Sequence, residues 1–497
     1  MRMRIQTVQI IGLLLIATGF IAFIYLSLPQ GNIEVIGYNL QQAFGLQTFP
    51  LSSATPEQKI SPLLQQAISR ALPGERIPVV IVLTAPKQMA VAQQQALLPR
   101  LQAYQFQLVS QTIYVANTMA GYVPADKVED MASEEYIEKI LYDGKIFRVS
   151  WDWPWSGNKV RVSNLQQSIQ QIGADKAWQL GYTGQGVKVI IIDSGIANNH
   201  PALQRNGKSL VIYEESFVPG ASDYTHWHGT HVAGIIASQD ATYKGVAPGI
   251  EGFIDLIAFD SDGSASPSWL LKALDEAYRI VTSQPGTYVS SNSWGTDFVD
   301  APEAEEMRMA AMNLADKIPV VFAAGNTGPG TSTIWAPGDA DRNGNEVITV
   351  AAVDTSGNIA TFSSRGPDTA GEEHNEPDVA APGVNIMSTV PTGFEAASGT
   401  SMATPHVAGV IALMLSKNPS LSNRDCLRVL EQTASGGGFN YATGYGIVQA
   451  DEAVQAASQT FITPTVPEWV YQAISIAIIL VGIVLVLKPK LEVMGIW

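Results

Sequence analysis

The sequence predicts an α/β fold with a central, mostly parallel sheet, preceded by a small α+β domain. Three observations support this prediction. Residues 187–192, Val-Lys-Val-Ile-Ile-Ile, are so apolar and β-branched that they indicate a strand buried on both faces. Residues 402–415 are almost wholly apolar and predict a buried helix. Residues 76–148 alternate short apolar strands with helical stretches, which is typical of a small α+β unit.

The N-terminal region, residues 1–30, contains a stretch that can cross a membrane. After Arg2 and Arg4, residues 8–28 carry no charge, and roughly 20 apolar residues span a bilayer as a helix. A signal peptide usually has a shorter apolar stretch and a small-x-small cleavage motif. The sequence therefore favours an uncleaved signal anchor over a removed signal peptide. Residues 31–75 are polar, Gln-rich and interrupted by Pro, and we expect a linker with one helix.

The small α+β domain is predicted at residues 76–148. Residues 149–165, with three tryptophans, connect it to the next domain. The expected elements are a strand at 77–83, a helix near 88–106, a strand pair around 111–123 and a short helix near 125–133, which leads to the segment 136–141.

Three polar residues stand at places where a fold of this class puts its chemistry. Asp193 ends the buried strand, and parallel sheets bind ligands at the carboxyl ends of their strands. His228 opens a segment with apolar residues at helical spacing, whereas His231, one turn further, is expected to be structural. Pro405 fits a helix only in its first turn, which puts Ser401 at the helix N-terminus, where a negative charge is favoured. Taken alone, each residue has a structural explanation as a turn former, a hydrogen-bonded histidine or an N-cap.

These segments together resemble the subtilase family of serine proteases (peptidase family S8). They follow the family order Asp, His, Ser. The resemblance covers roughly residues 166–455 and implies a three-layer, subtilisin-like catalytic domain at 166–460. The matching segments are Asp-Ser-Gly at 193–195, His-Gly-Thr-His at 228–231, Gly-Val-Ala-Pro at 245–248, Ser-Asn-Ser-Trp-Gly at 291–295, Ala-Ala-Gly-Asn at 323–326, Phe-Ser-Ser-Arg-Gly-Pro at 362–367, Asp-Val-Ala-Ala-Pro-Gly at 378–383 and Gly-Thr-Ser-Met-Ala at 399–403.

The resemblance implies a catalytic triad of Asp193, His228 and Ser401. A serine hydroxyl is a poor nucleophile near neutral pH, so His228 would take its proton and later return it to the leaving amine, while Asp193 orients the ring. The side chain of Asn326 and the backbone N–H of Ser401 would bind the developing oxyanion. This chemistry requires no cofactor.

The resemblance also implies where a protein or peptide substrate lies. Ser293, Trp294 and Gly295 resemble the strand whose backbone pairs with an extended substrate, a mode of binding that tolerates many sequences. Ile334 and Trp335 lie near the base of the family's principal pocket, which hints at a preference for an apolar side chain.

The domain at 76–148 is similar to the subtilase propeptide, which templates folding and then blocks the active site. The chain's own propeptide would thus be an inhibitory partner, and a self-cleaved bond is expected in or near 149–165. An unrelated adaptor domain is the alternative.

The C-terminal region predicts a second membrane segment. Residues 470–487 are uncharged and dominated by Ile, Leu and Val, and they lie beyond the catalytic domain, where they have no core to join. The positive-inside rule places both termini, including a tail at 488–497 with Lys488 and Lys490, in the cytoplasm. The catalytic domain would then face outwards from the cell membrane on a short tether at 461–469.

Structural calcium is usual in this family, but the sequence departs from the family pattern. Ala202 stands where many subtilases have a ligating Asp, and the loop at 238–244 looks short. A segment at 339–344 begins like an EF-hand loop without its terminal Glu, and an Asn-Gly turn explains it equally well. The calcium candidates are Asp339, Asp341 and Asn343.

Two other hydrolase classes fit less well. Residues 225–231 approximate the His-x-His-x-Asp-His cluster of metallo-β-lactamase-like hydrolases, but Thr230 replaces the Asp. An α/β-hydrolase is disfavoured because the segment at 399–403 lacks the last glycine of G-x-S-x-G and Ser401 comes last in the triad order.

The expected function is therefore a membrane-anchored, extracytoplasmic serine endopeptidase made as a self-processed proenzyme. A catalytically silent surface-binding protein on the same fold is the alternative. The net charge of −16 argues against nucleic acid as a partner, because binding to phosphates requires a basic face.

Overall fold

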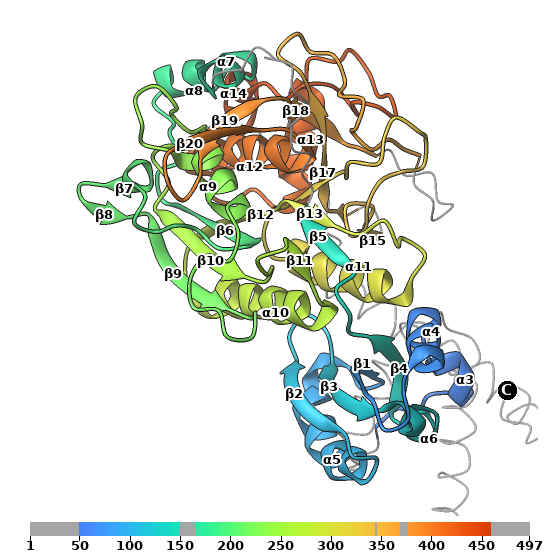
Figure 1. Cartoon of the computed structure of the whole chain (residues 1–497). Coiled ribbons are helices and arrows are strands. Elements are labelled where there is room, and N and C mark those ends of the chain that lie inside the picture. The colour runs from blue at the N-terminus through green and yellow to red at the C-terminus, as the bar shows by residue number, and fades with distance from the viewer. Residues whose placement is uncertain (1–48, 150–164, 343–344, 368–375, 459–497) are drawn as a thin grey trace, which may run out of the picture.

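The computed structural model contains an N-terminal α+β unit followed by a larger α/β domain (Figure 1). The predicted membrane segments at 8–28 and 470–487 fall outside the residues that the structure describes. Among the residues that the structure does describe, no helix combines the length and apolar character needed to cross a bilayer. The described residues are 49–149, 165–342, 345–367 and 376–458.

The N-terminal unit is a four-stranded antiparallel sheet in the order β2-β3-β1-β4, covered by helices on one face. Ile60 and Leu64 are buried in the same cluster as the sheet residues, so this unit begins before residue 76 with two short helices in the predicted linker. The elements are α3 (Pro56–Lys59), α4 (Pro62–Arg70), β1 (Arg76–Leu83), α5 (Ala90–Ala103), β2 (Gln107–Thr112), β3 (Thr118–Pro124), α6 (Val128–Ala132), β4 (Ile137–Tyr142) and the separate strand β5 (Phe147–Val149).

The larger domain is built on a seven-stranded parallel sheet in the order β18-β17-β14-β12-β6-β10-β9. The predicted α/β fold with a parallel sheet is thus confirmed. The sheet strands are β6 (Val187–Asp193), β9 (Val211–Ser216), β10 (Gly252–Ile257), β12 (Thr287–Asn292), β14 (Val320–Ala323), β17 (Ile348–Val353) and β18 (Val379–Pro382). The helices are α7 (Leu165–Gln171), α8 (Ala174–Gln179), α9 (His228–Ala237), α10 (Pro267–Ser283), α11 (Pro302–Ala315), α12 (Thr400–Lys417), α13 (Asn423–Thr433) and α14 (Ala450–Ala456). Short strands outside the main sheet are β7 (Gln204–Arg205), β8 (Lys208–Ser209), β11 (Ser264–Ala265), β13 (Trp294–Gly295), β15 (Asp341–Arg342), β16 (Asn345–Glu346), β19 (Ile386–Thr389) and β20 (Phe394–Ala397).

Helices cover both faces of this sheet. Val189 and Ile191 of β6 are buried in one cluster with residues of α9 and α12, whereas Ile190 and Ile192 are buried in another with residues of α10 and α11. Side chains of a strand alternate between its faces, so a strand covered on both sides is apolar at nearly every position. This three-layer arrangement brings the C-terminal end of β6 and the N-termini of α9 and α12 to one edge of the sheet (Figure 1).

The N-terminal unit docks on α10 and α11. Val80 and Leu141, on the sheet face that its own helices leave open, join the buried cluster of those two helices. The carboxylate of Asp275 on α10 accepts hydrogen bonds from the backbone N–H groups of Tyr114 (2.6 Å) and Val115 (3.0 Å). Apolar packing and a buried carboxylate therefore both hold the two parts together.

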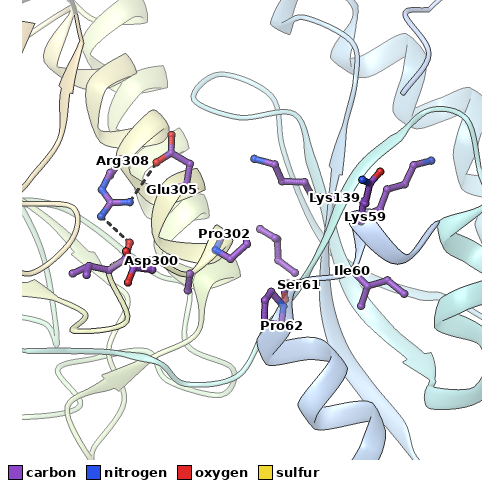
Figure 2. A pocket seen from close by; sticks show the side chains of 13 residues that line it. Lys59, Ile60, Ser61, Pro62, Lys139, Asp300, Pro302, Glu305 and Arg308 are labelled. Carbon is purple, nitrogen blue, oxygen red and sulfur yellow. Dashed lines mark hydrogen bonds and ion pairs between the residues drawn. The ribbon is translucent and has the colours of Figure 1, made fainter. Parts of the chain in front are cut away.

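Two further carboxylates lie at this interface. Glu303, in the first turn of α11, accepts a hydrogen bond from the backbone N–H of Tyr142 at 2.8 Å. On the other side of the interface, Asp143 of the N-terminal unit accepts a hydrogen bond from the backbone N–H of Ser268 in the first turn of α10, also at 2.8 Å. Beside these contacts, a cavity of about 410 Å³ separates α11 from the junction of α3 and α4 (Figure 2).

Candidate active site

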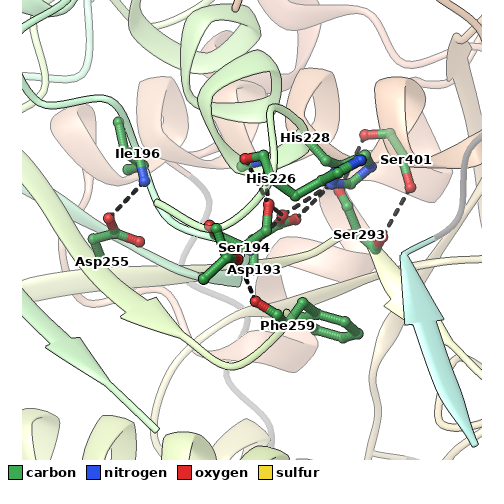
Figure 3. A network of polar contacts seen from close by, with 11 residues as sticks. Asp193, Ser194, Ile196, His226, His228, Asp255, Phe259, Ser293 and Ser401 are labelled. Carbon is green, nitrogen blue, oxygen red and sulfur yellow. Dashed lines mark hydrogen bonds and ion pairs between the residues drawn. The ribbon is translucent and has the colours of Figure 1, made fainter. Parts of the chain in front are cut away.

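Asp193 and His228 form a buried pair at the carboxyl edge of the sheet. Asp193 is the last residue of β6, and His228 is the first residue of α9. The Nδ1 atom of His228 lies 2.9 Å from both carboxylate oxygens of Asp193, and neither residue is exposed (Figure 3). The backbone N–H of Ser194 donates to the same carboxylate at 2.7 Å. An imidazole bound in this way through Nδ1 presents Nε2 to the other side.

Ser401 lies in the first turn of α12, close to this histidine (Figure 3). Its hydroxyl donates to the carbonyl oxygen of Ser293 at 2.8 Å. The Nε2 atom of His228 is buried and has no hydrogen-bond partner among the described residues. A rotation of the Ser401 side chain is therefore required before its proton can pass to His228, and such contacts often tighten only when substrate binds.

The expected position of Pro405 is wrong, although Ser401 does lie at the helix start. Pro405 is the sixth residue of α12 and lies in its second turn. Because proline lacks an N–H, the carbonyl of Ser401 loses its usual partner four residues on. The hydroxyl of Ser293 donates to this carbonyl at 3.0 Å and replaces the lost bond. A side chain from the link between β12 and β13 thus makes the proline tolerable.

Asn326 presents an unpaired amide nitrogen to the same site. Its side-chain oxygen accepts hydrogen bonds from the backbone N–H and the hydroxyl of Thr400, both at 3.0 Å, which fixes the orientation of the amide. The Nδ2 atom is buried without a partner among the described residues. Buried polar atoms are almost always paired, so the unpaired atoms of His228 and Asn326 indicate groups that await a ligand.

Trp294 and Gly295, which the sequence predicts to bind an extended substrate, pair in this structure with the chain's own strand β5. Trp294 pairs with Val149 and Gly295 with Arg148 in antiparallel register. On its other edge β5 pairs with β11, so the short sheet has the order β11-β5-β13 (Figure 1). The sequence interpretation missed β11, the second strand that pairs with β5, although the Asp262-Gly263 pair before it is a recognisable turn signal.

Among the described residues, neither His231 nor His226 belongs to a cluster of metal-ligating side chains. His231 is buried and its Nε2 contacts the carbonyl of Glu395 (3.1 Å), away from Asp193. Burial lowers the pKa of His231 to about 3 and that of His226 to about 4. Within the described ranges, the side chains that gather at metal-ligand distances do not include a histidine. The arrangement therefore gives no support to the metallo-hydrolase interpretation.

Of the three calcium candidates, Asp339 already has both carboxylate oxygens engaged by another side chain. Asp339 forms a two-pronged ion pair with Arg308, with a distance of 2.8 Å from Nε to Oδ1, so both its oxygens are engaged. Asp341 is the first residue of β15, which pairs with β16, and Asn343 lies outside the described residues.

A different acidic cluster brings together Glu346, Asp378 and Glu431, whose nearest carboxylate oxygens all lie within 4.8 Å of one another. Burial, followed by repulsion from Glu346, raises the pKa of Asp378. Asp378 also accepts a hydrogen bond from the backbone N–H of Thr349 at 2.6 Å. Acidic clusters occur without ions, so this group does not by itself establish a metal site.

Comparison with known proteins matches residues 184–446 to the subtilase family. Subtilisin E of Bacillus subtilis (strain 168) is 38% identical over 309 residues, covering 60% of this chain and 72% of the relative. A subtilisin of Bacillus pumilus is 38% identical over 309 residues, covering 60% of this chain and all of the relative. M-protease of Shouchella clausii is 34% identical over 352 residues, covering 69% of this chain and 80% of the relative.

Proposed function

Because the chain belongs to the subtilase family and is a serine endopeptidase, we propose that Ser401 is its nucleophile, His228 its general base and Asp193 the group that orients the base. Asn326 is the side-chain donor of the oxyanion hole. The observation that supports these roles most directly is the pair of buried, unpartnered nitrogens, His228 Nε2 and Asn326 Nδ2, beside Ser401. Each has the place and the chemistry that acyl transfer to serine requires.

The reaction proceeds in two halves. The Oγ of Ser401 attacks the peptide carbonyl carbon while its proton passes to His228 Nε2, and the carbonyl electron pair moves onto the oxygen that Asn326 Nδ2 binds. The C–N bond then breaks, and the imidazolium gives its proton to the leaving amine. Water, deprotonated by His228, attacks the resulting ester in the same way and releases the carboxylic acid and the Ser401 hydroxyl.

The N-terminal unit is, in this proposal, an inhibitory propeptide that the enzyme removes by its own cleavage. Its last described strand, β5, lies between β11 and β13, where an extended substrate would pair. The side chains of Asp193, His228 and Ser401 are fully buried while β5 is there. A strand in this position blocks other substrates.

The enzyme is also proposed to be anchored in the cell membrane, with the catalytic domain outside. This part rests on the sequence alone, on the uncharged segments at 8–28 and 470–487 and the basic residues that flank them.

A fluorophosphonate probe, which reacts with activated serines, tests the catalytic assignment. The wild-type chain should be labelled and should hydrolyse casein, and Ser401→Ala should abolish both. Ser416→Ala on the same helix is the matched control and should leave labelling intact. Labelling that persists in Ser401→Ala would remove the assignment, and a folded wild type without any labelling would favour the catalytically silent alternative.

Processing and topology have separate tests. The wild-type chain should mature to a form whose N-terminal residue, found by sequencing, lies within 150–165, whereas Ser401→Ala should stay uncut. A Ser401→Ala chain cut at the same place would show that another protease does the processing. For the anchor, protease added to intact cells should digest the catalytic domain while both termini remain protected, and a protected domain would reverse the proposed orientation.

A further inference from the structure

Trp335 fills the space between β13 and the segment that leads to Asn326. The residue is only 3% exposed, and its indole N–H donates to the hydroxyl of Thr327 at 3.0 Å. A Cβ added to Gly325 would lie 2.4 Å from Cγ of Trp335, and one added to Gly295 would lie 3.1 Å from Cβ of Trp335. The tryptophan thus lies directly against two glycine backbones, and its orientation is fixed.

The register of β5 identifies which substrate residue meets this side chain. Gly295 is paired with Arg148 and Trp294 with Val149, so the next position of a bound strand lies opposite Ser293. The carbonyl of Ser293 accepts the hydrogen bond from the Ser401 hydroxyl. A substrate residue at that position therefore brings its own carbonyl to the nucleophile.

The same register fixes the direction of that residue's side chain. The guanidinium of Arg148 lies over the ring of Trp335, 4.5 Å from its centroid. Side chains two positions apart on a strand point to the same face. The side chain of the residue opposite Ser293 therefore points towards Trp335 and the two glycine backbones at Gly295 and Gly325, where the indole already occupies the space.

We propose that Trp335 closes the side-chain pocket for the residue whose carbonyl is attacked, so that the enzyme cleaves after small residues such as Gly, Ala and Ser and excludes large apolar ones. This inference rests on the proposed role of Ser401 and of the β13 strand. It reverses the expectation from the sequence that Ile334 and Trp335 form the base of a pocket for an apolar side chain. The aromatic residue fills the pocket rather than lining it.

A series of peptide p-nitroanilides tests this proposal. The peptides carry Phe-Arg-Val, the sequence of β5, followed by Gly, Ala, Ser, Leu or Phe at the cleaved bond. Wild-type enzyme should show the highest kcat/KM with Ala, Ser or Gly and the lowest with Phe. Trp335→Ala should shift the Phe-to-Ala ratio of kcat/KM upwards by about 10- to 100-fold, the gain expected from burying one aromatic side chain. Trp335→Leu, a smaller change, should shift the same ratio in the same direction by less.

The matched control is Trp178→Ala, because Trp178 is a half-buried tryptophan that donates to the carbonyl of Val246, away from β13. It should leave the ratio unchanged. A wild type that cleaves after Phe as well as after Ala, or an unchanged ratio in both Trp335 variants, would overturn the inference. Fluorophosphonate labelling of each variant separates this failure from a failure of the proposed function: labelled enzymes with an unchanged ratio remove only the role of Trp335, whereas an unlabelled wild type removes the catalytic assignment beneath it.

Discussion

At the scale of single residues, the proposed chemistry depends on polar atoms that the fold buries but does not pair. Asn326, the proposed oxyanion donor, shows this most clearly, because Thr400 engages its oxygen and leaves Nδ2 without a partner among the described residues. We predict that Asn326→Ala lowers kcat by about 10²- to 10³-fold, the loss that one oxyanion donor causes in subtilisin itself, with little change in KM. Steady-state kinetics on a peptide substrate measures both constants. A change confined to KM would mean that Asn326 binds the ground state instead.

A second buried carboxyl close to the site, that of Asp255, makes the stability of the fold depend on pH. Asp255 on β10 is fully buried, and burial holds its pKa well above its usual range despite a hydrogen bond from the backbone N–H of Ile196 (2.7 Å; Figure 3). A raised pKa means that the folded state favours the neutral acid. The contribution of Asp255 to the free energy of unfolding is thus stabilising at low pH and is lost as pH rises through the raised pKa.

We therefore predict that Asp255→Asn, in an inactive Ser401→Ala background, has a Tm that exceeds that of its parent by an amount that grows from pH 5 to pH 9. Asparagine keeps an acceptor for the Ile196 N–H but cannot ionise. Thermal unfolding followed by circular dichroism checks this, with the exposed Asp300→Asn as the control. Parallel Tm curves for the variant and the parent would contradict it.

The residues that sequence reasoning could identify differ physically from those it could not. The segments of the proposed triad and of Asn326 stand in local motifs, with a strand end or a helix start visible in the chain itself. Trp335 and Pro405 depend on partners far away in sequence: Trp335 packs on Gly295, and the carbonyl freed by Pro405 is bonded by Ser293. Such contacts arise only when the strands are assembled.

At the scale of elements, α10 serves the parallel sheet on one side and the N-terminal unit on the other. The carboxylate of Asp275 accepts three successive backbone N–H groups, those of Ile113, Tyr114 and Val115. The strands of that unit could be predicted from their apolar pattern, but its docking could not, because about 160 residues separate Asp275 from these partners.

We predict that Asp275→Ala lowers the hydrogen-exchange protection of these three N–H groups by about 10- to 100-fold, since hydrogen bonds to a charged group contribute roughly 1.5–3 kcal/mol. The experiment uses the uncut Ser401→Ala chain, with Ser283→Ala at the exposed end of α10 as the control. Unchanged protection would mean that packing alone holds this loop.

At the scale of the whole molecule, the seam between the two parts should loosen as pH rises. Asp143 of the N-terminal unit caps the first turn of α10 by accepting from the backbone N–H of Ser268, and burial raises its pKa to about 6. Burial raises the pKa of Asp275 as well. The neighbouring Lys145 is engaged by Asp260 and does not neutralise Asp143. When the N-terminal unit docks on the larger domain, these carboxyl groups take up protons. The docking is therefore strongest at low pH and weakens as pH rises through about 6.

This linkage gives a prediction for the uncut Ser401→Ala chain. After correction for the intrinsic pH dependence of exchange, protection of the N–H groups of Ser266, Ser268 and Trp269 should fall by about tenfold between pH 5 and pH 7, while that of strand β6 stays constant. Asp143→Asn should make protection at 266–269 independent of pH but leave a residual dependence at Ile113, Tyr114 and Val115, which Asp275 holds. A fall that persists unchanged at 266–269 in Asp143→Asn would assign the pH response to other groups. If the fall is found, alkaline conditions release the N-terminal unit from the catalytic domain more readily than acidic ones.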